Sequence, residues 1–222
     1  KAGEEAAYRA AIAADSQHVE AHHNLGSILG GRGDLAGAAR SFAAALKIDP
    51  SDDGAKQGLH KAHYNLGDIL VQRGDLAGAA RSFAAALKID PSHAKAKECL
   101  LMAHFNLGLL LEERGDKEGA QAAFERVIDI DPHDADAHFK LGFMHEKRAE
   151  EAGFSAGCCG EEAYRAALRR DPQHANAHAG LQRILEKRGD KAGAEAAYSA
   201  QLYAKAGVHP ALVAAADADP YH

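Results

Sequence analysis

Apolar side chains recur every three or four positions through most of this chain, and short polar turns interrupt the pattern. That spacing is typical of an α-helix with one buried face. The segment RGDLAGAARSFAAALKIDPS occurs twice without a difference, at residues 32–51 and 73–92, an offset of 41 residues. The pattern therefore predicts a chain of repeated helices that stack on one another, without a single globular core.

Proline residues mark where each unit ends. They stand at intervals of 41, 41 and 40 residues, at Pro50, Pro91, Pro132 and Pro172. An aromatic residue precedes each by eight positions: Phe42, Phe83, Phe124 and Tyr164. Proline lacks a backbone N–H and disfavours a helical conformation in its predecessor, so each proline predicts the end of a helix. Two amphipathic patterns lie within each unit, which predicts two antiparallel helices per unit.

The RGD tripeptide appears four times, at residues 32–34, 73–75, 114–116 and 188–190. A cell-adhesion motif is one interpretation. A structural role explains the residues better, because Gly33 can adopt the left-handed conformation that ends a helix and Asp34 can cap the next helix. We therefore expect RGD to be the turn between the two helices of a unit.

A further segment, AHxNLG, recurs between the units around His22, His63 and His104, with weaker forms at 138–142 and 178–182. With the positions above, its spacing resembles the tetratricopeptide repeat, whose period is 34 residues. The matching set is Leu25, Gly26, Ala38, Phe42, Ala45 and Pro50, and it recurs in the next two units. The resemblance covers residues 4–205. It implies an all-α fold, a right-handed α/α superhelix of about 5.5 helix pairs.

The boundaries of the repeats follow from the places where the chain departs from a period of 34 residues. Seven extra residues precede AHxNLG in the second and third repeats, at 53–59 and 94–100. Seven residues turn a helix face by only about 20° and lengthen the helix by about 10 Å, so we expect longer first helices with an unturned face. The predicted segments are a truncated repeat at 1–16, five repeats at 17–52, 53–93, 94–134, 135–174 and 175–206, and a tail or cap at 207–222. The fourth repeat is expected to carry a loop insertion at 149–160.

Charge and cysteine content limit the classes of partner and the cellular compartment to expect. A net charge of −6 gives no electrostatic reason to expect nucleic acid, and no run approaches the length of a membrane span. The three cysteines, Cys99, Cys158 and Cys159, form no disulfide framework. We expect an intracellular protein, cytoplasmic or in an organelle lumen or stroma. Since the chain begins without Met, we expect it to be part of a longer protein.

Catalytic chemistry is not indicated. The sequence contains no GxSxG, HExxH, GxGxxG or P-loop pattern, so we expect no enzyme activity and no cofactor. The histidines of AHxNLG belong to successive repeats about 8–10 Å apart, too far to share a metal ion, and are expected to pack between helices. The adjacent Cys158 and Cys159 lack the spacing of a zinc half-site and are expected to be free thiols.

Asn24, Asn65 and Asn106 are the strongest candidates for binding. Each precedes a leucine expected in the core, and a carboxamide both donates and accepts hydrogen bonds, so it can pair with any peptide unit. The HxNLG spelling resembles the repeats of nucleocytoplasmic O-linked N-acetylglucosamine transferase and its plant relatives. That resemblance implies an asparagine ladder that holds an extended peptide in a concave groove. The predicted groove residues are Asn24, Asn65, Asn106, Lys140, His23, Tyr64, Phe105, Phe139, Ser27, Asp68, Leu109 and Phe143.

The expected function is a protein-interaction scaffold or adaptor that binds an extended segment of a protein partner. One alternative is an architectural or assembly subunit of a large complex. Another is the substrate-recruiting arm of a transferase whose catalytic domain lies outside this sequence. A clamp for an acidic C-terminus matches at only two of its five positions, Asn106 and Lys140.

Overall fold

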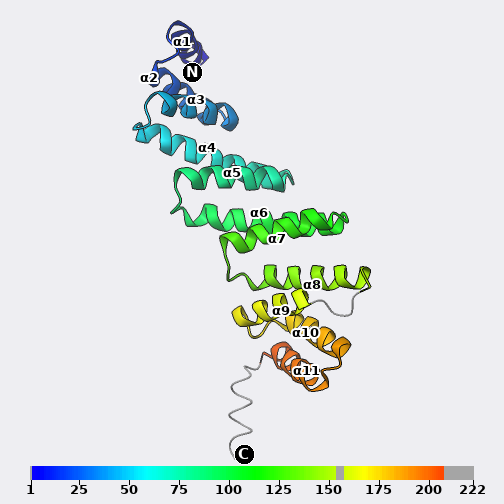
Figure 1. Cartoon of the computed structure of the whole chain (residues 1–222). Coiled ribbons are helices and arrows are strands. Elements are labelled where there is room, and N and C mark those ends of the chain that lie inside the picture. Colours follow the sequence, from blue (N-terminus) through cyan, green and yellow to red (C-terminus); the bar gives the residue numbers. More distant parts are fainter. Residues whose placement is uncertain (1, 154–157, 208–222) are drawn as a thin grey trace, which may run out of the picture. The chain divides into compact units, whose positions relative to one another are not determined.

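The computed structural model describes residues 2–153 and 158–207, and this part of the chain forms eleven α-helices and no strand (Figure 1). The helices are α1 (Ala2–Ala14), α2 (Val19–Gly31), α3 (Leu35–Ile48), α4 (Asp53–Gln72), α5 (Leu76–Ile89), α6 (Ala94–Glu113), α7 (Lys117–Ile130), α8 (Ala135–Glu151), α9 (Cys158–Arg170), α10 (Ala175–Arg188) and α11 (Lys191–Lys205). The all-α prediction is confirmed. The predicted tail at 207–222 lies, except for Gly207, outside the described residues.

The described helices pack as consecutive pairs within two compact units, and the boundary between the units falls inside α6, between residues 106 and 107. In the first unit α2 pairs with α3 and α4 with α5, and α3 also packs on α4. In the second unit α8 pairs with α9 and α10 with α11, and α9 also packs on α10. The second helices α3 and α9 therefore contact both their own first helix and the first helix of the following repeat.

The RGD segments are turns, as predicted. Gly33, Gly74, Gly115 and Gly189 all have positive φ, between 77° and 83°. Asp34 then caps α3, because its carboxylate accepts a hydrogen bond of 2.8 Å from the N–H of Gly37. Aspartates at the same place cap α5, α7 and α11. The glycine ends one helix and the aspartate starts the next, so the motif is explained by the turn alone.

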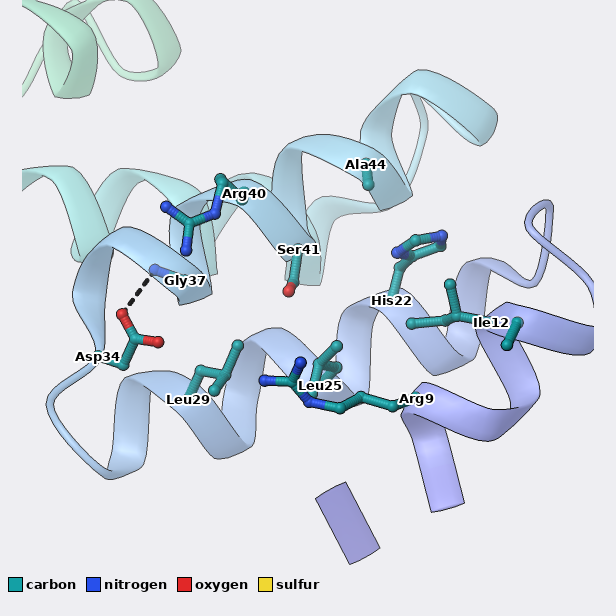
Figure 2. A pocket seen from close by; sticks show the side chains of 11 residues that line it. Arg9, Ile12, His22, Leu25, Leu29, Asp34, Gly37, Arg40, Ser41 and Ala44 are labelled. Atoms are coloured by element: carbon teal, nitrogen blue, oxygen red, sulfur yellow. Dashed lines mark hydrogen bonds between the residues drawn. The ribbon is translucent and has the colours of Figure 1, made fainter. Parts of the chain in front are cut away.

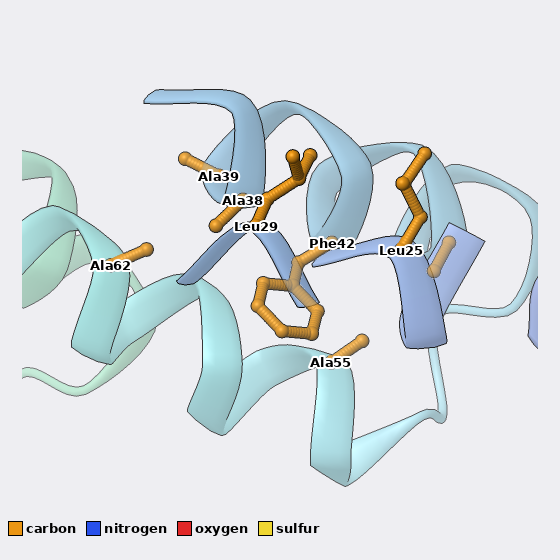
Figure 3. Close-up of a cluster of buried hydrophobic side chains, with 8 residues drawn as sticks. Leu25, Leu29, Ala38, Ala39, Phe42, Ala55 and Ala62 are labelled. Atoms are coloured by element: carbon orange, nitrogen blue, oxygen red, sulfur yellow. The ribbon is translucent and has the colours of Figure 1, made fainter. Parts of the chain in front are cut away.

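Phe42 of α3 forms the centre of a small core in the first unit. Its side chain points between Leu25 and Leu29 of α2 and the alanines Ala55 and Ala62 of α4 (Figure 3). Burying such a side chain contributes about 1.5–3 kcal/mol, and the small alanines let the helices approach one another. The same core position recurs as Phe83, Phe124 and Tyr164, all fully buried.

The first helices differ in length, since α4 and α6 have 20 residues each whereas α2 has 13. The seven-residue segments at 53–59 and 94–100 lie inside these longer helices. In the fourth repeat the helices reach further into the predicted 149–160 loop than expected. Residues 149–151 belong to α8 and 158–160 to α9, so the connection is shorter, and residues 154–157 lie outside the described part.

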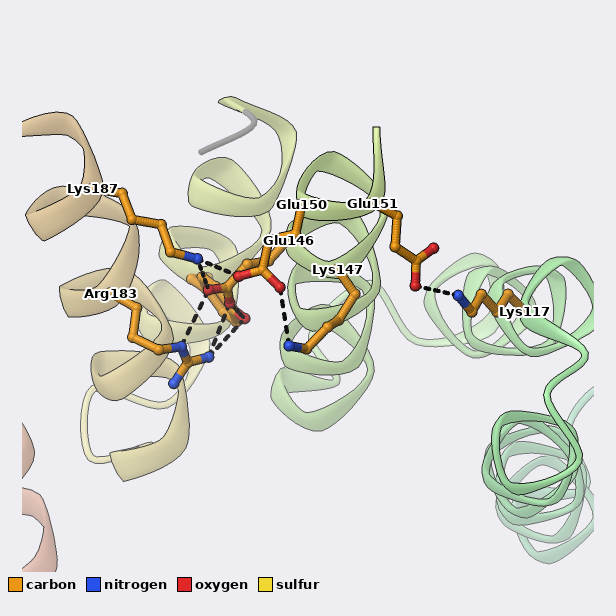
Figure 4. A network of polar contacts seen from close by, with 8 residues as sticks. Lys117, Glu146, Lys147, Glu150, Glu151, Arg183 and Lys187 are labelled. Carbon is orange, nitrogen blue, oxygen red and sulfur yellow. Dashed lines mark hydrogen bonds and ion pairs between the residues drawn. The ribbon is translucent and has the colours of Figure 1, made fainter. Parts of the chain in front are cut away.

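A buried carboxylate ties the last two repeats of the second unit together. Glu146 of α8 is 2% exposed and accepts hydrogen bonds from Tyr164 Oη at 2.7 Å and Arg183 Nη2 at 2.9 Å (Figure 4). Burial opposes ionisation of Glu146, but the hydrogen bonds from Arg183 and Tyr164 outweigh it and hold its pKa below the ordinary value. Lys187 bridges Glu146 and Glu150, and its hydrogen bonds together with those of Lys147 lower the pKa of Glu150 to about 2.

Candidate functional site

Positions in the first helices can also be counted from the residue that caps the amino end of each helix. The side chains of His18, Asp52, His93, Asp134 and His174 each accept a hydrogen bond from the backbone N–H three residues later. Six residues after each cap stand Asn24, Gly58, Cys99, Lys140 and Gly180. In α4, this position lies directly against the preceding second helix: a Cβ on Gly58 would come within 2.4 Å of Phe42 Cζ. In α10, Gly180 stands in the same relation to Tyr164.

The distance of each candidate asparagine from its cap shows where it lies along its helix. Asn24 is six residues after its cap, whereas Asn65 and Asn106 are thirteen residues after theirs. The seven-residue difference preserves the side of the helix but moves these asparagines about 10 Å towards the carboxyl end. Asn65 therefore shares a cavity with Gly30 and Gly31 near the end of α2. The asparagines form a stepped series along the helices.

Two cavities of the first unit are built from equivalent residues of successive repeats. The first, of about 370 Å³, lies between α2 and α4 with α3 as its floor. The second, of about 210 Å³, lies between α4 and α6 with α5 as its floor. All nine residues that line the second stand 41 positions after a residue that lines the first. These nine are Asp68, Val71, Gln72, Leu76, Phe83, Cys99, Met102, Ala103 and Asn106. The duplication of the sequence has therefore duplicated a cavity.

Each cavity brings together predicted groove residues from two neighbouring repeats. Ser27 of α2 and Asn65 of α4 line the first, and Asp68 of α4 and Asn106 of α6 line the second. Asn106 is exposed and Asn65 is half-buried. Apolar floors from Phe42 or Phe83 lie beneath a carboxamide in both. Small and apolar groups line both cavities together with carboxamides, Asn65 in the first and Gln72 and Asn106 in the second. Such a lining suits a side chain and the peptide unit that carries it.

The residues that precede each asparagine position are engaged in contacts between repeats. His23 lies edge-on to Phe42, with ring centroids 5.6 Å apart, and its Nδ1 is 2.9 Å from Oδ2 of the capping residue Asp52. Hydrogen bonds from the N–H of Ala55 and from His23 hold the pKa of Asp52 below its ordinary value. His23 thus joins its own second helix to the start of the next first helix.

The same contact recurs in the later repeats. Tyr64 lies against Phe83 and the capping His93, at 5.7 and 5.2 Å between ring centroids. Phe139 lies against Tyr164 and the capping His174, at 5.9 and 5.0 Å. Aromatic contacts of this kind stabilise by about 0.5–1.5 kcal/mol each. The rings of His23, Tyr64 and Phe139 therefore pack between helices of neighbouring repeats, and their place in the groove stays a prediction. Phe105, at the equivalent place in α6, is half-buried.

The predicted groove residues of the second unit have other partners. Lys140 donates a hydrogen bond of 2.9 Å to Glu112 of α6. Phe143 lies under Lys147, whose Nζ is 5.7 Å from the ring centroid, and lines a cavity of about 290 Å³ with Glu112 and residues of α7. Leu109 is half-buried. In this unit a lysine–glutamate pair stands at the asparagine position, and it offers charge where the first unit offers amides.

A further cavity of about 470 Å³ lies between α1, α2 and α3 (Figure 2). Its polar groups are largely engaged within the protein. Asp34 caps α3, Arg9 pairs with Glu5, and His22 Nε2 lies 3.1 Å from the carbonyl oxygen of Ser16. His138 and His178 make the same contact with the carbonyls of Pro132 and Pro172. These three histidines therefore fix the first turn of their helices.

No group of three or more His, Cys, Asp or Glu side chains in the described ranges is arranged to hold a metal ion. None of the helices in these ranges is long and apolar enough to cross a membrane. Cys99 is a half-buried free thiol, and burial together with this neighbouring thiol raises the pKa of Tyr64. The side chains of Cys158 and Cys159 lie outside the described part.

Helix pairs, glycine–aspartate turns and a repeated cavity define a helical-repeat protein. Two family models described as tetratricopeptide repeat match the chain, one over residues 58–133 and one over 5–53 and 160–207. Together these matches cover more than half of the sequence. The chain belongs to the tetratricopeptide repeat family, whose repeats are protein-interaction modules.

Several solved structures are similar to the chain. The crystal structure of MamA is 22% identical with a TM-score of 0.44, and the match covers 82% of this chain and 95% of MamA. YrrB, a TPR protein with an unusual peptide-binding site, is 17% identical over 89% and 92% of the two chains with a TM-score of 0.38. BtubC from P. vanneervenii is 18% identical over 94% and 91%, with a TM-score of 0.43. No curated protein sequence gives a significant match.

Proposed function

We propose that the first unit is a protein-binding module that holds a segment of a partner in extended conformation along the first helices. The observation that carries this proposal is the pair of equivalent cavities, each with an asparagine at its rim and an aromatic floor. In this reading Asn65 and Asn106 bind the backbone of the partner, and the cavities receive its side chains. Asn24 adds a further amide nearer the amino end of α2.

Energy considerations assign most of the affinity to the cavities. A net contribution of about 0.5–1.5 kcal/mol per hydrogen bond gives only a few kcal/mol for the asparagines. A micromolar complex needs about 8 kcal/mol. The difference must come from side chains of the partner that enter the cavities and bury apolar surface at about 25 cal/mol per Å². The asparagines then position the partner's backbone, and the cavities determine which of its side chains can bind.

The test compares partner recovery by three forms of the full chain. Asn65→Ala with Asn106→Ala removes both amides, and Asn176→Ala is the matched control, because Asn176 is exposed at the start of α10 in the other unit. Proteins recovered from a cell extract by each form are quantified by mass spectrometry. We expect a set of partners to be retained by the wild type and by the control and to fall about tenfold or more with the double variant, the effect of about 1.4 kcal/mol.

An equal recovery by all three forms, with unchanged helicity, would show that binding uses another surface. An architectural subunit would give that result, because its contacts would spread over the outer faces of the helices. If the double variant does lose partners, those partners can be divided into fragments. A short linear fragment that binds alone would establish the extended mode.

A further inference from the structure

One face of α4 connects the two cavities of the first unit. Gly58, Lys61, Ala62 and Asn65 of α4 line the first cavity, and Asp68, Val71 and Gln72 line the second. Successive steps of three and four residues keep these positions on one side of a helix. A partner segment that follows this face passes from one cavity to the next without leaving α4.

The two cavities share their framework but differ in charge. Lys61 of the first corresponds to Met102 of the second, and Ser27 of the first corresponds to Asp68 of the second, in both cases 41 residues apart. The first cavity therefore carries one positive charge and the second one negative charge. Neither Lys61 nor Asp68 forms an ion pair within the described residues, where Lys61 is exposed and Asp68 half-buried.

The separation of the two charges can be expressed in residues of a bound segment. Lys61 and Asp68 are seven residues apart on one helix face, which is about 10 Å along the axis. A polyproline-II segment rises about 3.1 Å per residue and places residues i and i+3 on one side, about 9 Å apart. Asn65 lies between the two charges, where the backbone of such a segment would pass.

We propose that the bound segment carries an acidic side chain for Lys61 and a basic side chain three residues away for Asp68. This inference rests on the proposed function and specifies the partner's chemistry. The exposed Val71 and Met102, at 42% and 59%, flank the second cavity and cover the stem of the basic side chain. Opposite charges at the two ends also fix the direction in which the segment lies.

The experiment selects peptides from a phage-displayed library of random dodecapeptides against the full chain. We expect peptides selected by the wild type to be enriched in acidic–x–x–basic or basic–x–x–acidic patterns. Lys61→Glu should change the selected pair to two basic residues, and Asp68→Lys should change it to two acidic residues. Arg81→Glu is the control, because Arg81 is exposed on the second helix α5, and it should select the wild-type pattern.

A synthetic peptide with the leading sequence then gives affinities by fluorescence polarisation. Each charge reversal should weaken it about fivefold to tenfold at low salt, and the difference should shrink as salt is raised. Selected peptides without such a pair, or the same peptides from all four forms, would overturn the charge inference and leave the proposed function standing. If the wild type selects no peptide above background, both the inference and the proposed function fail.

Discussion

Gly58 of α4 packs against the face of Phe42 of α3 so closely that the ring occupies the space of a side chain at position 58. Gly26 of α2 lies on the same ring from the other repeat, with Phe42 Cδ1 2.9 Å from the place of a Cβ. One phenylalanine therefore fills the contact between two first helices. The distance between repeats is set by the thickness of an aromatic ring.

A methyl group at this contact should destabilise the first unit. Gly58→Ala gains up to about 1 kcal/mol of helix propensity but overpacks the core, which costs about 1–3 kcal/mol, so we expect a net loss. Gly31→Ala is the control, because no atom lies within 4 Å of its Cβ position, and it should be neutral or slightly stabilising. Urea unfolding followed by circular dichroism measures both. Equal stability of the two variants would contradict the packing described here.

The turn aspartates should contribute through capping. Asp75 accepts a hydrogen bond of 2.8 Å from Gly78 at the start of α5, so Asp75→Ala should lower the free energy of unfolding by about 0.5–2 kcal/mol. Asp75→Asn keeps the acceptor and should cost much less. Hydrogen exchange of the first turn of α5 gives a local readout. Equal protection in the alanine and asparagine variants would show that the cap is not what stabilises this turn.

Acid should loosen the last two repeats through Glu146. Its pKa is lowered in the folded state, so its contribution is present above the ordinary value of about 4.5 and is lost as pH falls through the folded pKa. Glu146→Gln should cost about 2–3 kcal/mol at neutral pH because it removes hydrogen bonds to a charged group. The gap in melting temperature between wild type and variant should close below the ordinary carboxyl pKa. A constant gap from pH 7 to 3 would mean that the charge of Glu146 is not involved.

Removal of residues 53–59 should give a shorter but folded chain. The deletion joins Asp52 to His60, so that Ala62 stands three residues after the cap, as Ala55 does now. Helicity per residue and a cooperative urea transition should be retained. Removal of residues 53–57 turns the helix face by about 140° and should abolish cooperative unfolding. If both deletions behave alike, the two-turn insertion is not what preserves the buried face.

The local features of this fold were predictable from sequence because they depend on neighbouring residues. Gly33 and Asp34 specify a turn by their own chemistry, and Pro50 cannot continue the helix that precedes it. The place of His23 was not predictable in this way, since it depends on Asp52, 29 residues later, which caps the first helix of the next repeat. The AHxNLG pattern alone contains no sign of that contact.

The candidate site likewise has features that the sequence predicts and features that it does not. Placing Ser27, Asn65, Asp68 and Asn106 on one face required only the helical period. Ser27 meets Asn65 and Asp68 meets Asn106 across repeats, and these pairs depend on how far each first helix is displaced along its axis relative to the preceding first helix. Periodicity along one helix carries no information about that displacement. The contact of Glu146 with Arg183, 37 residues later, was hidden for the same reason.

The identical segments 32–51 and 73–92 enclose one complete first helix. An unequal recombination between the gene regions that encode them would remove or add 41 residues, and both new junctions would read as the present ones do. Each such event would change the number of cavities by one and shift the end of the array by a fixed step. The length of the binding face can therefore change by whole cavities without a new turn, cap or helix stop.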